Sequence, residues 1–156
     1  MIITTQPITA ADIDEMNAWL GASDLDRFMN GWIPRCVREG HWPSALCRWD
    51  FILLDQTRVG TIWIERSSSE STTADLGVLI AAPEHRRRGI GTQVVCDAER
   101  AAKEDWGTQV VQLRVRASNQ AATACYQRIG YTVNERTVKS QGETSYEVLH
   151  MAHALS

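Results

Sequence analysis

A short basic stretch with two glycines is the first part of the sequence that could do chemistry. It lies between a run typical of a strand and a run typical of a helix, and it reads His85, Arg86, Arg87, Arg88, Gly89, Ile90, Gly91, Thr92. Glycine lets the backbone turn sharply and approach a ligand closely, and the first N–H groups of a helix attract an anion. The stretch is therefore either a phosphate-binding turn or a plain solvated turn, and its neighbours must distinguish the two.

Length and composition favour one globular domain over residues 1–156. Of the 156 residues, 44% are hydrophobic and 22% are charged. The net charge of −3 and the pI near 5.8 argue against a nucleic-acid binder that relies on bulk charge. Cationic residues are nevertheless concentrated around the basic turn, because residues 84–116 hold seven Lys or Arg against five Asp or Glu.

Other sequence signals indicate a soluble cytoplasmic protein with no nucleic-acid or membrane partner. No apolar run reaches the roughly 18 residues of a membrane span, and the N-terminus lacks the pattern of a signal peptide. The cysteines lack the paired spacing of a metal site, so we expect no metal and mostly buried free thiols. They are Cys36, Cys47, Cys96 and Cys125. The histidines show no metal-binding spacing either and are expected at the surface; they are His41, His85, His150 and His153.

The first half of the chain predicts a strand, two helices and a hairpin. Residues 1–5 form a β-branched run, and Thr9 with Asp12 has the spacing of a capping box at the start of a helix. Residues 24–39 predict a second, less regular helix that Pro34 would start, stop or kink. Two apolar runs, residues 51–54 and 59–64, flank a polar turn and predict the hairpin.

The second half alternates strands and helices. The strand-like runs are residues 74–81, 111–115, 131–138 and 144–151. Between residues 74–81 and residues 111–115, a helix with one apolar face begins at Ile90 and ends at Gly107. Between residues 111–115 and residues 131–138, Asn119 caps a helix that ends at Gly130.

Two motifs on these elements resemble the GNAT superfamily of acetyl-CoA-dependent N-acetyltransferases. The first is Arg86-x-x-Gly89-x-Gly91, after a strand that Pro83 closes. The second is Asn119-x-x-Ala122-x-x-x-Tyr126-x-x-x-Gly130-Tyr131. The resemblance covers residues 74–133, whereas the first half matches only in the order of its elements. It implies an α+β fold with a central mixed, mostly antiparallel sheet that splays open and is flanked by helices.

The resemblance also implies where acetyl-CoA binds as co-substrate. Its pantetheine arm would pair with the strand backbone at Leu79, Ile80 and Ala81. Its pyrophosphate would sit on backbone N–H groups, with the Thr92 hydroxyl as a further donor; the residues are Arg86, Arg87, Arg88, Gly89, Ile90, Gly91 and Thr92. Asn119 completes the expected set. The arginine side chains either are solvated or reach the 3′-phosphate.

Acetyl transfer to an amine needs one group that takes a proton from the amine and one that protonates the leaving thiolate. The resemblance implies that Tyr126 is the acid, since a phenol with a pKa of about 10 can donate to a thiolate whose conjugate acid lies near 8.5. Alternatively, Tyr126 packs in the core and only hydrogen-bonds the sulfur. Asp75 is the candidate base, because it precedes Arg86 by 11 residues, where histone-type members carry a glutamate.

Other readings of the base stay open. Asp75 acts through a water or is an ordinary exposed strand residue, and Glu65 and Glu70 are alternatives that could simply attract a cationic amine. Residues 113–119 also resemble enzymes that acetylate the N-terminus of a ribosomal protein. Those enzymes carry their glutamate base where this chain has Arg114, which puts their substrate and mechanism in doubt here.

These observations predict direct attack of a primary amine on acetyl-CoA in a ternary complex. A covalent route through Cys125 is disfavoured, because it lies about 100° around the helix from Tyr126 and has no evident histidine partner. A small-molecule acceptor is preferred to a peptide terminus or a lysine. The reason is that five of the six tryptophans lie in the first 63 residues, and Trp32, Trp42 or Trp63 could line a pocket rather than only pack the core. A non-catalytic acyl-CoA-binding module is the alternative from another class, and a homodimer fits the family.

Overall fold

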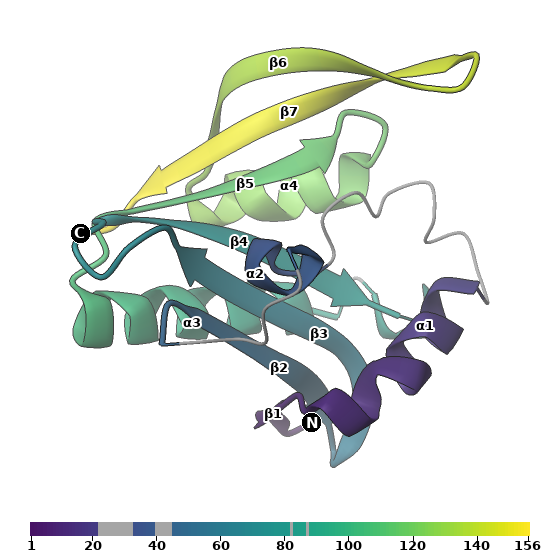
Figure 1. The fold of residues 1–156 in the computed structure, drawn as a ribbon, viewed down its shortest axis with the longest axis vertical. Helices are drawn as coiled ribbons and strands as arrows, with labels where there is room; N and C mark the ends of the chain where they lie inside the picture. The colour runs from purple at the N-terminus through teal and green to yellow at the C-terminus, as the bar shows by residue number, and fades with distance from the viewer. Residues whose placement is uncertain (22–32, 40–44, 82, 87) are drawn as a thin grey trace.

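The computed structural model describes all residues except 22–32, 40–44, 82 and 87. Its strands form one sheet in the order β1-β2-β3-β4-β5-β7-β6 (Figure 1). They are β1 (Ile3–Pro7), β2 (Cys47–Leu54), β3 (Thr57–Arg66), β4 (Thr73–Ile80), β5 (Val110–Arg116), β6 (Thr132–Gln141) and β7 (Thr144–Ala154). Neighbouring strands are antiparallel except for β4 and β5, which are parallel. The expected mixed, mostly antiparallel sheet is confirmed.

Helices cover both faces of this sheet. The described ones are the 3₁₀ turns η1 (Ala10–Asp12) and η3 (Pro83–His85), and the α-helices α1 (Ile13–Gly21), α2 (Arg35–Arg38), α3 (Ile90–Trp106) and α4 (Gln120–Ile129). In Figure 1, α2 lies in front of the strands, and α3 and α4 lie behind them. Each face of the sheet is therefore covered by helices, and the protein has two separate hydrophobic cores.

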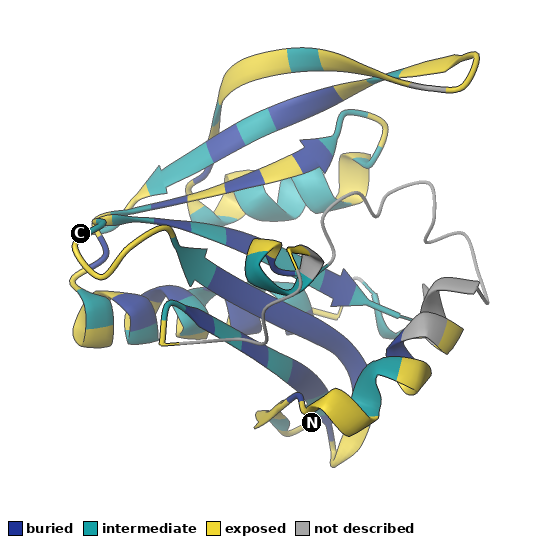
Figure 2. Ribbon diagram, viewed as in Figure 1, coloured by how far each residue is buried: buried dark blue, intermediate teal, exposed yellow. Residues whose placement is uncertain are grey.

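The two cores lie on opposite faces because side chains alternate along each strand. On the α3–α4 face, Val94 and Val95 pack with Val111 and Leu113 in the larger core. On the other face, Met16 of α1 packs with Trp49, Phe51 and Trp63. Strand β3 is buried along most of its length, whereas β6 is mostly exposed (Figure 2).

Local sequence signals set most element ends. Asp55 and Gln56 have φ of 49° and 73°, which is the two-residue turn that matches the twist of a hairpin. The turn is therefore shorter than the four polar residues suggest, and β2 and β3 extend further. The capping box at Thr9 is confirmed, since its N–H donates to Asp12 Oδ2 at 2.8 Å.

Two expectations for the first half need adjustment. Strand β1 runs from Ile3 to Pro7 rather than over residues 1–5, because its ladder to β2 pairs Ile3 with Leu54 and Pro7 with Asp50. The helix expected over residues 24–39 falls partly outside the described residues. Its described part is the four-residue α2, which follows Pro34, so the proline precedes a helix there.

The parallel strands β4 and β5 separate soon after they meet. Their ladder has three pairs, Thr73 with Val110, Ala74 with Val111 and Asp75 with Gln112. From Leu76 in β4 and Leu113 in β5 onward, the two strands no longer pair with each other. The splayed sheet is thereby confirmed, and the gap exposes backbone and side chains from both strands.

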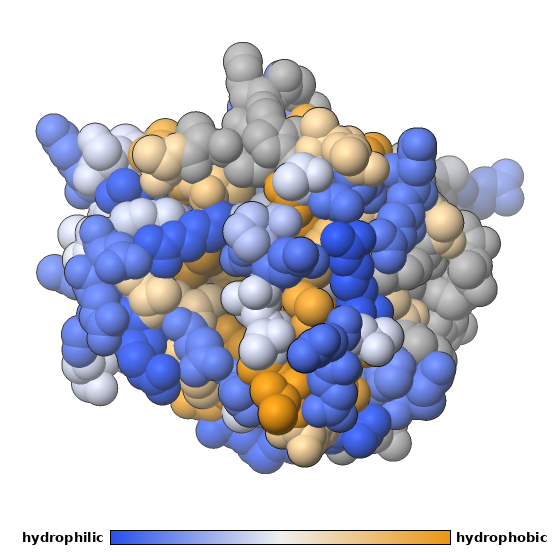
Figure 3. Space-filling model, turned by 90° about the horizontal axis from the view of Figure 1, so that it is seen from below, coloured by the Kyte–Doolittle hydropathy of each residue, from blue (hydrophilic) through white to orange (hydrophobic). Residues whose placement is uncertain are grey.

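The surface of the described residues is mainly polar. Their exposed large hydrophobic side chains are Met1, Ile2 and Val138. The face in Figure 3 is largely hydrophilic, with hydrophobic residues visible in small areas between polar ones. Within the described ranges, none of the helices combines the length and the apolar character needed to cross a membrane.

Candidate active site

A cavity of about 540 Å³ opens where β4 and β5 separate, and we call it the central cavity. Its strand residues include Trp63, Glu65, Asp75, Gly77, Gln112, Leu113, Arg114, Val115, Arg116, His150 and Met151, and its helix residues include Arg35, Ala122 and Tyr126. Leu113 and Val115 belong to the core on the α3–α4 face, whereas Gln112 and Arg114 alternate to the other face. The central cavity therefore extends through the gap and connects the two faces of the sheet.

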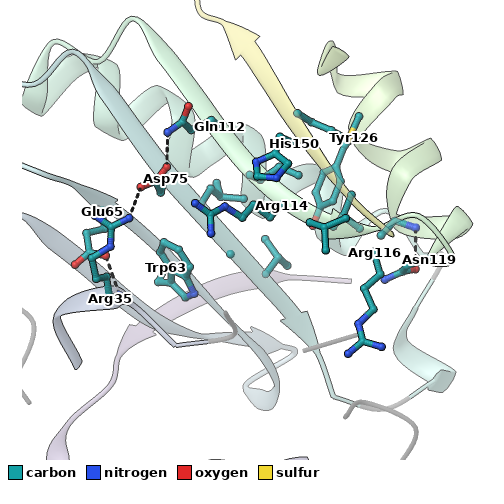
Figure 4. Close-up of a pocket in the computed structure, with 18 of the residues that line it drawn as sticks. Arg35, Trp63, Glu65, Asp75, Gln112, Arg114, Arg116, Asn119, Tyr126 and His150 are labelled. Carbon is teal, nitrogen blue, oxygen red and sulfur yellow. Dashed lines mark hydrogen bonds and ion pairs between the residues drawn. The ribbon is translucent and has the colours of Figure 1, made fainter. Parts of the chain in front are cut away.

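Asp75 lies at the point where the strands part. Gln112 Nε2 donates to Asp75 Oδ1 at 2.7 Å, and an Arg35 guanidinium nitrogen lies 4.0 Å from Asp75 Oδ2 (Figure 4). The Asp75 side chain is 38% exposed, so a water or an amine can reach it from the cavity. Of the candidate bases, Asp75 and Glu65 line the central cavity, whereas the exposed Glu70 is not among its lining residues.

Glu65 of the neighbouring strand β3 is paired with Asp75, but its carboxylate is occupied by hydrogen bonds within the protein. Its Oε1 accepts from the N–H of Arg35 at 2.9 Å, and its Oε2 accepts from the N–H of Cys36 at 3.0 Å. The carboxylate thus satisfies the first N–H groups of α2 and holds that helix beside the cavity. Asp75 is therefore the better placed of the two to exchange a proton with an amine.

Tyr126 lines the same cavity from α4. Burial, with a smaller contribution from the neighbouring Cys125 thiol, raises the pKa of its phenol above the ordinary value. The phenol therefore stays protonated at neutral pH and is available as a donor. A carboxylate at one end of the cavity and a protonated phenol on α4 form the pair of groups that acyl transfer to an amine requires.

A buried hydrogen-bond network supports Tyr126 from behind. The Tyr131 ring meets the Tyr126 ring edge-on at 5.8 Å, and the Tyr131 hydroxyl donates to Glu99 Oε2 at 2.7 Å. His153 Nδ1 lies 2.8 Å from the same oxygen. His153, which the sequence predicts to lie at the surface, is half-buried, with 23% of its side chain exposed, because it bonds to the buried Glu99. Glu99 itself could have been noticed, since it falls on the apolar face of the helix that begins at Ile90.

The start of α4 is held by Asn119. Its Oδ1 accepts from the N–H of Ala122 at 3.3 Å, so the expected N-cap is confirmed. Asn119 also lines the central cavity, next to Ala122 and on the same helix as Tyr126 (Figure 4). One side chain therefore fixes where the helix that carries Tyr126 begins.

The basic glycine turn lies just outside the central cavity, at the start of α3. Gly89 has φ of 79°, which favours glycine, and no side chain caps the helix that begins at Ile90. A Cβ at Gly91 would meet only Cys125 Sγ, at 3.9 Å, so packing within the protein does not require glycine there. Uncapped N–H groups and a glycine that leaves room for a ligand fit the pyrophosphate of acetyl-CoA.

The side chains of this turn are partly engaged within the protein. Arg86 Nε donates to the carbonyl of Ile80 at 3.2 Å, which ties the turn to the end of β4. Ile90 is buried in the core, Arg88 is exposed, and Arg87 lies outside the described residues. The Thr92 hydroxyl lies 3.3 Å from Cys125 Sγ.

The end of β4 beside this turn keeps a free edge towards β5. The Leu79 side chain is buried, and the Ala81 N–H donates to the carbonyl of Val59 at 2.8 Å. On its other side, β4 has no pairing with β5 after Asp75. An amide-rich ligand arm fits along this edge, and the Thr92–Cys125 contact places the glycine turn next to the helix of Tyr126.

One tryptophan of the first half lines the central cavity. Trp63 is mostly buried, and its indole lies across Gly77, where a Cβ would come within 2.3 Å of its Nε1. Trp49 is part of the core. Trp32 and Trp42, the other pocket candidates, lie outside the described residues.

Two thiols gather beside Glu65 although their spacing in the sequence gave no signal. One ligand atom each of Cys36, Cys47 and Glu65 lies within 4.8 Å of the other two. Burial raises the pKa of both thiols, most strongly at Cys47. The two cysteines are therefore neutral thiols at pH 7, and the buried Cys47 behaves as part of the core under α2.

Comparisons with known proteins agree with this site. A model of the acetyltransferase (GNAT) family matches residues 14–131, which is most of the chain. A spermidine N-acetyltransferase from Vibrio cholerae, solved with CoA and spermine, has a TM-score of 0.79 at 14% identity, covering 97% of this chain and 95% of that chain. An aminoglycoside acetyltransferase solved with coenzyme A has a TM-score of 0.72 at 17% identity, covering 98% and 95%.

Among curated proteins, a search by sequence found no match. The solved structures share the fold at identities too low to assign a substrate, whereas the family match extends from α1 to the second residue after α4. The chain therefore belongs to the GNAT family of acetyltransferases and is an acyltransferase with acetyl-CoA as its co-substrate.

Proposed function

We propose that this protein transfers the acetyl group of acetyl-CoA to a primary amine of a small molecule, and that the transfer takes place in the central cavity. The observation that carries this proposal is that Asp75 and Tyr126 line one continuous space that passes through the sheet. Acetyl-CoA supplies the thioester, and it would enter from the α3–α4 face. The amine would enter from the face that carries Glu65 and Asp75.

The proposed seat of acetyl-CoA uses backbone groups more than arginine side chains. The free edge of β4 near Leu79, Ile80 and Ala81 would pair with its amide-rich arm. The N–H groups from Arg86 to Thr92 would hold the pyrophosphate, supported by the dipole of α3. Asn119 would complete this seat from the start of α4. The contact of the Thr92 hydroxyl with Cys125 supports it, because it brings the turn beside α4.

Asp75 and Tyr126 would move the protons of the reaction. Asp75 accepts a proton from the ammonium form of the amine, directly or through one water, before the neutral nitrogen bonds to the acetyl carbon. As the carbon–sulfur bond breaks, the Tyr126 hydroxyl donates its proton to the sulfur, and the second proton that the nitrogen loses on becoming an amide returns to the Tyr126 oxygen. Burial raises the pKa of this phenol, and the same desolvation raises the pKa of a thiol that leaves beside it, so the transfer is not strongly uphill.

The walls of the central cavity favour a small acceptor over an extended peptide. Arg35 at the start of α2 bounds it on one side, and Asn134 and Lys139 of β6 bound it on the other. A peptide chain would need an open groove across these elements. The solved structures of similar fold are consistent with this choice, since they are named for spermidine and aminoglycoside acetylation.

The test is a panel of amines incubated with acetyl-CoA and the purified protein, read as free thiol and as N-acetylated product by mass spectrometry. The panel contains polyamines, aminoglycosides, amino acids, aryl alkylamines and short peptides with a free terminus. We expect at least one small amine to be acetylated faster than every peptide. If acetyl-CoA binds but no amine releases thiol, the protein is an acyl-CoA-binding module and the proposal is wrong.

A matched pair of variants links the activity to the central cavity. Asp75→Asn should reduce kcat for the best amine at least tenfold and leave the affinity for acetyl-CoA unchanged. Asp97→Asn is the control, because Asp97 lies on the exposed side of α3 and pairs with Arg100. Equal activity of both variants would show that Asp75 takes no part in the reaction.

A further inference from the structure

The central cavity carries more positive than negative side chains, although the chain as a whole is acidic. Its cationic lining residues are Arg35, Arg114, Arg116 and Lys139, against the carboxylates Glu65 and Asp75. The net charge of the chain is −3. A cleft with charge opposite to that of the whole molecule concentrates ligands of the opposite sign, so this cavity is suited to an anion.

The opposite charges stand on different walls. Glu65 and Asp75 are paired residues of β3 and β4. Arg114 lies on β5, on the other side of the gap, and pairs in register with His150 of β7. In Figure 4, Arg114 lies between Asp75 on one side and Tyr126 on the other. A ligand in the gap therefore meets carboxylates on one wall and a guanidinium on the other, beside the reacting groups.

The guanidinium of Arg114 is free to bind such a ligand. Within the described part of the chain, the Arg114 side chain has no hydrogen bond, ion pair or ring contact. Two of the other cations are already engaged, because Arg35 lies 4.0 Å from Asp75 and Arg116 stacks on the Tyr146 ring at 3.9 Å. The fourth, Lys139, is an exposed residue of β6. His150 Nε2 lies 3.0 Å from the Thr137 hydroxyl, so it is also held in place.

The phosphates of acetyl-CoA are not the natural partner of Arg114. Their proposed seat is the first turn of α3, whose residues Gly91 and Thr92 do not line the central cavity. The Arg114 side chain belongs to the opposite face of β5 from Leu113, which packs in the core under α3 and α4. The anion that reaches Arg114 must therefore belong to the acceptor.

We propose that Arg114 binds a carboxylate of the acceptor, so that the substrate is a small amino acid whose amine lies at Asp75. This inference rests on the proposed function and names its substrate class. Arg114 is two residues beyond Gln112, the partner of Asp75, and two residues advance a strand by about 7 Å. An amine and a carboxylate a few bonds apart span such a distance, and a guanidinium binds a carboxylate through two parallel hydrogen bonds.

The same arrangement disfavours a polyamine. A second ammonium group near Arg114 would face a like charge in a partly enclosed site, which is costly. An amino acid instead neutralises both walls, with its ammonium at Glu65 and Asp75 and its carboxylate at Arg114. The protein should therefore differ in acceptor from the spermidine N-acetyltransferase that shares its fold.

The test compares acceptors that differ only in the anion. The panel contains α-, β- and γ-amino acids, the carboxamide of each, the corresponding aminophosphonates, and spermidine. For the preferred amino acid we expect kcat/KM about tenfold or more above that of its carboxamide, and we expect spermidine to be a poor acceptor. A preference for the aminophosphonate would assign a phospho group rather than a carboxylate to Arg114 and would overturn the amino-acid proposal.

The variant Arg114→Gln gives the second readout. It should lower kcat/KM for the amino acid by about ten- to a hundredfold, chiefly through KM, and change the carboxamide less than about twofold. Arg114→Lys should recover part of the loss. Arg100→Gln is the matched control, because Arg100 is an exposed α3 residue. Unchanged melting temperature and acetyl-CoA affinity would show that Arg114→Gln is folded.

The outcomes separate this inference from the proposed function. Equal loss for the amino acid and its carboxamide in Arg114→Gln, or wild-type preference for spermidine, would overturn the role of Arg114 and leave acetyltransfer in the central cavity intact. If wild type acetylates no member of either panel, the proposed function is wrong and the substrate class falls with it.

Discussion

Gln112 and Asp75 are joined by a hydrogen bond of 2.7 Å across the last residue pair that connects β4 to β5. The bond fixes one carboxylate oxygen of Asp75 at the point where the sheet opens. The other oxygen is left towards Arg35 and the central cavity. The proposed base is thus oriented by the same two strands whose separation creates the site.

The first prediction concerns this orientation. Gln112→Leu removes the donor, so the Asp75 carboxylate should lose its fixed position and kcat should fall severalfold, with the affinity for acetyl-CoA unchanged. Steady-state kinetics and calorimetric titration measure the two quantities. If Gln112 acts through Asp75, its replacement should add little in an Asp75→Asn background. Additive losses in the double variant would show that the two residues act independently.

The second prediction concerns Gly91, where stability and binding should change in opposite directions. Gly91→Ala has room for its Cβ, which meets only Cys125 Sγ at 3.9 Å, and alanine is a better helix former by up to about 1 kcal/mol. The melting temperature should therefore stay the same or rise. The Kd for acetyl-CoA should nevertheless increase about tenfold, because the methyl group occupies the approach to the proposed pyrophosphate seat.

The control for this prediction is Gln93→Ala, an exposed residue of the same helix whose change should leave the Kd unaltered. If Gly91→Ala binds acetyl-CoA as tightly as wild type, the pyrophosphate does not bind at the start of α3 and the prediction is wrong.

Signals carried by neighbouring residues allowed much of the fold to be predicted from the sequence. The caps at Thr9 and Asn119 and the helix end at Gly107 depend on residues a few positions away, and the structure confirms each. The motif of the basic glycine turn and the motif that contains Tyr126 together indicated the family in the same way. Strand ends were less accurate, because the limits of β1 depend on its pairing with β2.

The parts that could not be predicted depend on contacts between distant segments. Glu65 lies 29 residues from Cys36 and caps its helix only because β3 runs beneath α2. Glu99 and His153 are 54 residues apart and meet through the packing of α3 against the last strand. In the sequence, Arg114 stands out only because similar enzymes carry a glutamate base at its position, and only the separation of β4 and β5 places it on a wall of the cavity.

The third prediction concerns stability at alkaline pH. Burial raises the pKa of the Cys47 thiol above the ordinary value of 9.0 that it has in the unfolded chain. The folded state favours the neutral thiol. The contribution of this thiol to the free energy of unfolding is therefore complete below pH 9 and is lost progressively as the pH rises above 9. From pH 8 to pH 10, this group alone should lower the free energy of unfolding by about 1 kcal/mol.

Urea unfolding of wild type and Cys47→Ala at the two pH values measures this effect. Between pH 8 and pH 10, the free energy of unfolding of the variant should fall less than that of wild type, even if the substitution itself destabilises the protein at pH 8. Tyr126 and Tyr131 also have pKa values raised by burial, so some further loss above pH 10 should remain in both proteins. Identical pH dependence of the two proteins would show that Cys47 ionises without affecting the fold.

The most direct test of the account is the rate of thiol release by Tyr126→Phe with the preferred amine, measured together with its Kd for acetyl-CoA. The variant keeps the ring that packs against Tyr131 and removes only the hydroxyl that we propose as the proton donor to the leaving sulfur. Tyr146→Phe, on β7, is the matched control. We predict a fall in kcat of at least tenfold with an unchanged Kd, whereas wild-type kcat in Tyr126→Phe would contradict the proposed role of the phenol in the central cavity.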